Sequence, residues 1–168
     1  MNKGNLDLLH RGVALGFAAR SKKNLEHIES AFEGGHDVHL VTQIVQSMFG
    51  LVVFAWETDD SMALWKYRVA DLADQEGWPR WQITKGHADS KTLNGLVPRI
   101  RHAFAHANIK FSSDEREPER VHITLWNMNK AGTAKTWQGS IQADELAEFC
   151  KRFADLLTRL AHNTPQWG

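Results

Sequence analysis

The sequence lacks several features that would assign it to a class at once. Its single cysteine, Cys150, cannot form an internal disulfide, and the N-terminus shows no secretory signal, so we expect a protein of the reducing cytoplasm. The longest apolar stretch runs from Met48 to Trp56, well short of the roughly 20 residues that a membrane helix needs. We therefore expect a buried helix there and no membrane association.

An excess of charge of one sign is also lacking. The chain has 20 basic and 20 acidic residues, so it has no global positive field that would hold any nucleic acid. Contact with nucleic acid must therefore be local. A length of 168 residues with 42% hydrophobic side chains fits one domain, spanning residues 1–168, with a core of its own.

The spacing of apolar residues predicts a mainly helical protein. Helices are expected over residues 7–32, from Asp37 onward, over 61–74, over 90–108, and from Ala143 to just before Pro165. Gly34-Gly35 and the segment 76–79 are predicted to end the first and third of these helices.

Two further segments are not predicted to be helical. Residues 78–90 are expected to form an irregular surface connection, in which Trp78 and Trp81 could cover a cleft. Alternation of apolar and polar residues over 121–126, with a return over 135–141, predicts a β-hairpin. The predicted fold class is therefore predominantly all-α: a helical bundle with one β-hairpin inserted before its last helix.

Seven tryptophans are scattered along the chain, which argues against one stacking surface for bases. Trp56 and Trp65 fit helix cores, and Trp126 and Trp137 are placed to pair across the hairpin. We expect this set to serve mainly in packing.

The segment RIRHAFAHANI, residues 99–109, is unusually rich in ionisable groups for one helix. A core-facing stripe is predicted for the apolar residues at helical spacing, namely Leu93, Leu96, Val97, Ile100, Phe104 and Ala107. The remaining face carries Arg101, His102, Ala105 and His106, without the long Lys and Glu side chains of a typical solvated face. A small alanine among ionisable groups lets another surface approach, which favours a contact surface or a cleft over a simple solvated face.

Arg101-His102-Ala103-Phe104-Ala105-His106 resembles the R-x4-H motif of the HEPN family. The order of helices, the hairpin and the long closing helix are also similar, from about Arg11 to Leu160. The resemblance implies a metal-independent endoribonuclease without a cofactor, in which two subunits bring their motif helices together to form one cleft. It also implies a toxin–antitoxin or phage-defence setting, with RNA as substrate and an antitoxin or regulatory protein as partner.

These residue types suit the cleavage of RNA, which carries its own nucleophile in the 2′-hydroxyl. Histidine transfers protons near neutral pH, and the planar guanidinium of arginine binds phosphate oxygens in two places. We assign an acid or base role to His106, phosphate binding to Arg101 and a supporting role to His102. Asn108 and Arg99 are further candidates for binding RNA.

The spacing of Arg101 and His106 favours a site made by two subunits. Five positions on a helix place the two side chains about 140° apart, so they do not point the same way. A two-fold contact would let Arg101 of one subunit and His106 of the other border a shared groove.

Two alternatives stay open. His102 and His106 have the spacing of two zinc ligands, and His87, His122 or Cys150 could supply a third. A HEPN-like module could also bind RNA, nucleotide or a partner protein without cutting.

Overall fold

The computed structural model describes residues 3–56 and 64–163, and side chains over 16–53 and 64–160. Its α-helices are α1 (Lys3–Glu33), α2 (Leu40–Trp56), α3 (Val69–Glu76), α4 (Leu93–Ala105) and α5 (Ala143–Asn163). Its strands are β1 (Gln82–Lys85), β2 (Ile109–Phe111), β3 (His122–Met128) and β4 (Lys135–Gln142), and two short 3-10 helices are η2 (His87–Ser90) and η3 (Pro118–Arg120). No helix of these residues is long and apolar enough to cross a membrane.

The predicted hairpin is confirmed as β3 and β4, but it belongs to a larger sheet. Strands β1 and β2 flank it, which gives a four-stranded antiparallel sheet in the order β1-β4-β3-β2. The fold is mostly helical but mixed α/β, so the expectation of a predominantly all-α bundle with only a hairpin is wrong in this respect. The two flanking strands have four and three residues, too few for a clear alternating pattern.

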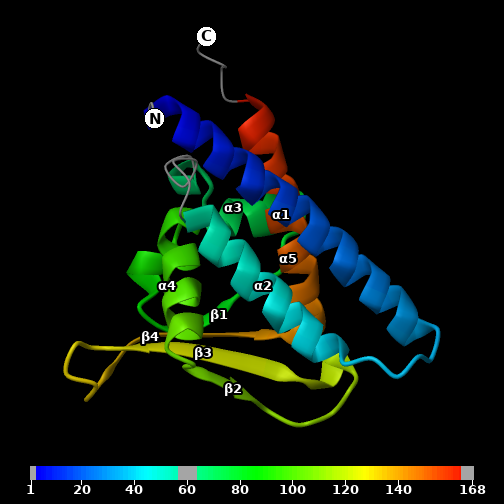
Figure 1. Ribbon diagram of the computed structural model, residues 1–168. Coiled ribbons are helices and arrows are strands. Elements are labelled where there is room, and N and C mark those ends of the chain that lie inside the picture. Colours follow the sequence, from blue (N-terminus) through cyan, green and yellow to red (C-terminus); the bar gives the residue numbers. More distant parts are fainter. Residues whose placement is uncertain (1–2, 57–63, 164–168) are drawn as a thin grey trace.

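The labelled α-helices lie on one side of the sheet in Figure 1. The inner face of the sheet buries Ile123, Leu125, Trp137 and Ile141 against them. Helix α2 packs against α1, α5 and α4, and α4 also packs on β3. Every second residue of β3 and β4 is at least partly exposed on the other face, which none of these helices covers.

The first and last helices agree with the sequence analysis. Gly35, with φ of 78°, ends α1 as predicted, and the backbone N–H of His36 donates to the carbonyl of Ala31. Helix α5 buries Leu146, Phe149, Phe153 and Leu156 on one face. Helix α5 has a long apolar stripe, whereas α1 is predicted from the shorter series Leu25, Ile28 and Phe32 and from the glycine pair after it.

Several local predictions need correction. Helix α2 begins at Leu40 rather than Asp37, whose carboxylate forms an ion pair with Arg116. The helix expected over 61–74 is confirmed only from Val69 onward, as α3; residues 64–66 form a 3-10 turn, and Trp65 is 59% exposed rather than buried. Residues 61–63 of that segment lie outside the described residues.

The expected irregular connection over 78–90 contains β1 and η2. Trp78 and Trp81 pack in the core, where both are buried with their rings edge-on to Phe149 at centroid distances of 5.4 and 5.9 Å, and Trp78 also lines a surface pocket beside Glu76 and Arg159. Trp126 and Trp137 do not pair across the hairpin: Trp126 lies opposite Gln138 and Trp137 opposite Asn127, so the two indoles are on opposite faces.

Candidate functional site

Helix α4 presents its core stripe largely as the sequence predicts. Leu93, Leu96, Val97 and Ile100 are fully buried. Phe104 is only half-buried, and Ala107 is exposed beyond the end of the helix, so these two predicted core positions need correction. Ala103, which was not predicted, is buried and extends the stripe.

The helix ends at Ala105, three residues before the predicted end at Asn108. Ala107 adopts the left-handed conformation with φ of 52°, the one positive φ at a non-glycine residue among those described. The N–H of Asn108 donates to the carbonyl of Ala103 (2.8 Å) and the N–H of Ala107 to that of Phe104 (3.0 Å), which is a Schellman motif. His106 is therefore the C-cap residue, and the chain turns sharply after it.

His102 and His106 are both exposed and lie side by side, with ring centroids 4.4 Å apart. Partial burial lowers the pKa of His102 below its ordinary value, and electrostatic repulsion from the neighbouring His106 and Arg101 lowers it further. A neutral His102 at physiological pH can accept a proton or a hydrogen bond on its free ring nitrogen.

Arg101 is half-buried and lies, around the helix axis, between Phe104 and Ala105. From that position its side chain separates the apolar side of α4 from the histidine pair. The surface that runs from Phe104 over Arg101 and Ala105 to the two histidines is continuous around the exposed side of the helix.

Arg99 lies one turn before His102 on the same face of α4. Its guanidinium forms an ion pair with Asp89 of η2 (2.6 Å), and its carbonyl accepts a hydrogen bond from the side-chain amide of Asn127 (3.1 Å). Gly95 allows this close approach, because a Cβ there would lie 2.0 Å from the carbonyl oxygen of Asp89. Arg99 therefore already has an acidic partner.

Asn108 is half-buried and connects α4 to the sheet. Its carbonyl accepts a hydrogen bond from the N–H of Trp126 (3.2 Å), and its own N–H closes the helix end. The backbone of this residue thus holds the histidine pair close to the edge of the sheet.

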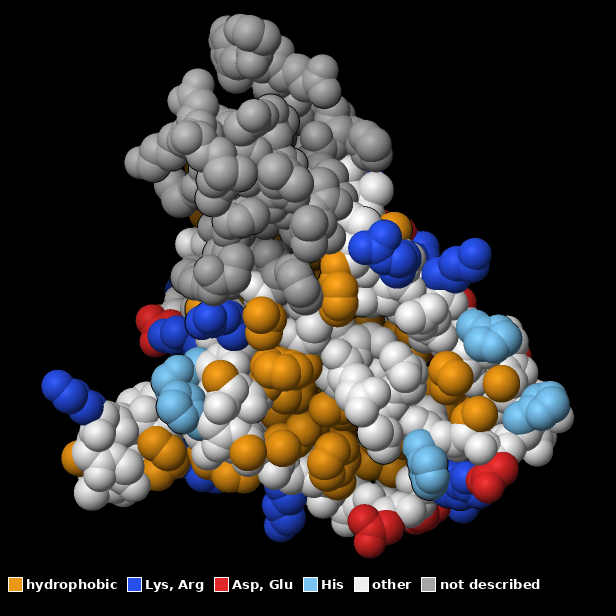
Figure 2. Space-filling model, viewed as in Figure 1, with side chains coloured by type: hydrophobic (Ala, Val, Ile, Leu, Met, Phe, Trp, Pro, Cys, Tyr) orange, Lys and Arg blue, Asp and Glu red, His pale blue; other side chains and the backbone are white. Residues whose placement is uncertain are grey.

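An apolar patch, formed by Val45 and Phe49 of α2 and Phe104 of α4, lies beside Arg101. Phe49 is 42% exposed, and its ring contacts that of Phe104 at a centroid distance of 5.8 Å. Figure 2 shows hydrophobic side chains gathered between α2 and α4 on this face of the molecule. This patch is not predicted from the sequence, because the apolar run of α2 is nearly continuous and does not show which of its side chains stay exposed.

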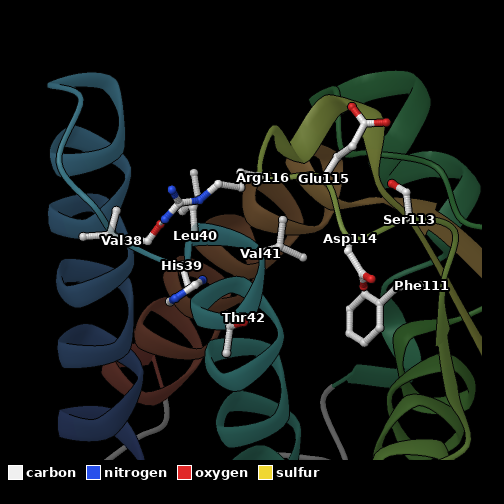
Figure 3. Close-up of a pocket in the computed structure, with 10 residues that line it drawn as sticks. All are labelled: Val38, His39, Leu40, Val41, Thr42, Phe111, Ser113, Asp114, Glu115 and Arg116. Atoms are coloured by element: carbon white, nitrogen blue, oxygen red, sulfur yellow. Dashed lines mark hydrogen bonds between the residues drawn. The ribbon is translucent and has the colours of Figure 1, made fainter.

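A separate cavity of 230 Å³ lies between the start of α2 and the loop after β2. Figure 3 shows Arg116 reaching from that loop toward the start of α2, where it pairs with Asp37. None of the predicted site residues lines this cavity. It is therefore distinct from the candidate site on α4.

The zinc alternative finds no third ligand in the described part of the chain, where no group of three or more His, Cys, Asp or Glu side chains is placed to hold a metal. Cys150 is buried in the core, with its sulfur 3.5 Å from that of Met48, and burial raises the pKa of its thiol. It serves as a core thiol rather than as a ligand beside His102 and His106.

Comparison with known families decides the relationship. The model of the HEPN pEK499 p136 family matches residues 1–163. The chain belongs to this HEPN family. The match covers every helix and strand of the described structure and includes the segment from Arg101 to His106 of this HEPN domain. No curated protein and no solved structure matches the chain.

Proposed function

We propose that this HEPN domain is a metal-independent endoribonuclease whose site includes Arg101, His102 and His106. The observation that carries the proposal is the arrangement at the end of α4: two exposed histidines with ring centroids 4.4 Å apart, on a surface continuous with a half-buried arginine. This arrangement supplies a proton acceptor, a proton donor and a phosphate-binding cation without a metal.

The reaction needs two proton transfers. The 2′-hydroxyl loses its proton and attacks the adjacent phosphorus, and the bond from phosphorus to the 5′-oxygen breaks. The departing 5′-oxygen takes up a proton, so the products are a 2′,3′-cyclic phosphate and a 5′-hydroxyl. His106 makes one of these two transfers, as acid or base, and solvent water takes up or supplies the other proton, while Arg101 stabilises the charge on the phosphate oxygens. His102, whose pKa is lowered, supports His106 as a neutral hydrogen-bonding neighbour.

We further propose that two copies form the cleft. Arg101 and His106 point about 140° apart around the helix axis, so one α4 does not direct both at the same phosphate. The exposed apolar patch of Val45, Phe49 and Phe104 lies next to Arg101 and is suited to burial against a second copy. A two-fold contact at this place would bring Arg101 of one copy toward His106 of the other.

The setting we propose is a toxin–antitoxin or phage-defence system. An unrestrained ribonuclease damages its own cell, so a neutralising antitoxin or a regulatory protein is expected to control it. This part of the proposal is supported by membership of the HEPN family alone.

The test is cleavage of labelled total RNA in excess chelator by the wild type, Arg101→Ala and His106→Ala. We expect the wild type to release fragments that end in a 2′,3′-cyclic phosphate, and each variant to be slower by about a hundredfold or more. His27→Ala is the matched control, because His27 is an exposed histidine of α1 outside the site. Thermal melting should be the same for all four proteins.

Undiminished cutting by both site variants would contradict the assignment. If the wild type binds RNA or nucleotide and releases no fragments, the alternative of a non-catalytic RNA-binding, nucleotide-binding or protein-interaction module is correct instead.

A further inference from the structure

The four strands contain no aspartate or glutamate, although the chain has 20 acidic residues. They contain three lysines, which come from three different strands: Lys85 of β1, Lys110 of β2 and Lys135 of β4. A sheet of this composition does not repel a polyanion, in contrast to the acid-rich loop over 114–119 that follows β2.

The register places all three lysines on the face that the helices leave uncovered. Lys110 lies opposite Thr124, whose neighbours Ile123 and Leu125 point inward to the core. Residues directly opposite each other in an antiparallel pair share a face of the sheet. Lys110 is therefore on the outer face with Thr124.

Two irregularities in the ladder bring the other lysines to this face. Between Asn127 and Met128 the register shifts, so that Lys135 lies opposite Met128. Between Ile83 and Lys85 it shifts again, so that Lys85 lies opposite Gln138. At each shift one strand contains an extra residue, Thr136 in β4 and Thr84 in β1, which interrupts the alternation of side chains. Lys135 and Lys85 therefore have the same orientation as Lys110.

Trp126 is at the centre of this outer face and is half-buried. It lies opposite Gln138, and the Nζ of Lys135 lies 4.9 Å from the centroid of the Trp126 ring. The nearby outer positions are the uncharged polar residues Gln82, Thr124, Gln138 and Ser140. An aromatic ring for stacking, cations for phosphates, and amides and hydroxyls for base edges are what an unpaired nucleotide strand requires.

We propose that the outer face of the sheet, centred on Trp126 with Lys85, Lys110 and Lys135 around it, binds single-stranded RNA. The inference rests on the proposed function for the identity of the ligand. It adds to that function a substrate-binding surface outside the cleavage site.

The connection from α4 to β2 places the outer face of the sheet next to the proposed cleavage site. Edge strand β2 begins at Ile109, three positions after His106, and the carbonyl of Asn108 accepts a hydrogen bond from the backbone N–H of Trp126. The acidic loop lies at the opposite end of β2. Bound RNA therefore runs over the half of the sheet nearest the β3–β4 turn, toward His106.

The experiment measures binding of a fluorescent, unstructured RNA of about 12 nucleotides by fluorescence anisotropy. His106→Ala is used as the background so that the probe stays intact. We expect Trp126→Ala to weaken binding about tenfold, and Lys110→Gln with Lys135→Gln to reduce the slope of log affinity against log salt by about 0.7 for each lysine. A duplex RNA of the same sequence should bind more weakly than the single strand.

Trp65→Ala is the matched control, because Trp65 is exposed, lies outside the sheet and also has a lysine, Lys66, over its ring at 5.9 Å. Equal binding by the Trp126 and Trp65 variants, or no binding of RNA by the parent protein at low salt, would overturn the inference. If Trp126→Ala does not fold by circular dichroism, the two lysine variants decide the matter through the salt slope.

The two proposals fail separately. Cleavage that depends on His106 together with binding that ignores Trp126 would leave the ribonuclease in place and reject the sheet surface. Binding that needs Trp126 without cleavage by any form of the protein would support the sheet surface and reject the ribonuclease. The variant Trp126→Glu tests a third outcome. If it binds RNA as the parent protein does but differs from it in oligomeric state, the outer face serves contact between copies of the chain, and the inference is overturned.

Discussion

At the scale of single residues, Ala107 determines where α4 ends, directly after the histidine pair. A left-handed backbone costs an L-residue roughly 1–2 kcal/mol, and glycine or asparagine usually occupies this position at the end of a helix. Here alanine holds it, and the two hydrogen bonds of the Schellman motif maintain the turn. The turn directs the chain into β2 and leaves His106 at the exposed corner of α4.

The variant Ala107→Gly should therefore be more stable by about 0.5–1 kcal/mol. Glycine relieves the backbone strain in the folded state, and its greater conformational freedom in the unfolded chain offsets only part of that stabilisation. Urea unfolding measures the change. Ala105→Gly is the matched control: Ala105 is exposed in the last turn of α4, where glycine should destabilise by a similar amount. If Ala107→Gly destabilises the protein as Ala105→Gly does, the backbone at position 107 is not strained.

At the scale of elements, the sequence predicts what has a long periodic pattern and misses what depends on distant partners. Helix α5 and the hairpin were predictable because their apolar spacing is regular over many residues. Strand β2 was not, because Ile109 to Phe111 becomes a strand only by pairing with β3. The early end of α4 was missed because Ala107 carries no signal for a helix end, whereas Arg101, His102 and His106 of the proposed site all lie in the motif.

The contact between η2 and β4 is one such long-range dependence. The indole N–H of Trp137 donates to the hydroxyl of Ser90 (2.7 Å), and both residues are buried. Ser90→Ala should cost about 1–3 kcal/mol of unfolding free energy, because it leaves the buried N–H without its acceptor. Urea unfolding of Ser113→Ala is the comparison: this hydroxyl makes a 3.4 Å contact near the surface, and its loss should cost no more than about 0.5 kcal/mol. An equal loss of unfolding free energy in Ser90→Ala and Ser113→Ala would contradict a stabilising role for the buried hydrogen bond.

At the scale of the whole molecule, the proposed site depends on a second copy. The apolar patch beside Arg101 is a modest surface by itself, but a two-fold axis doubles every contact that it makes. Its position decides which residues of the two copies meet. A change in the patch should therefore alter association and cleavage together.

Phe49→Glu should convert the protein to a species of 19.1 kDa in light scattering, whereas the wild type should have twice that mass. A charge placed in a contact that excludes water is costly, and loss of the second copy should reduce RNA cleavage as well. Trp65→Glu, at another exposed aromatic residue, should leave both mass and cleavage unchanged. A monomeric wild type that cuts RNA at full rate would reject the shared cleft.

The acid-free sheet has one further consequence for the chain as a whole. Formal charges cancel over the sequence, so the three lysines of the strands are balanced by three surplus acidic side chains elsewhere. The outer face of the sheet is therefore a locally positive surface on a chain without net charge. Added salt should slow the association of this face with a polyanion even though the protein as a whole is neutral.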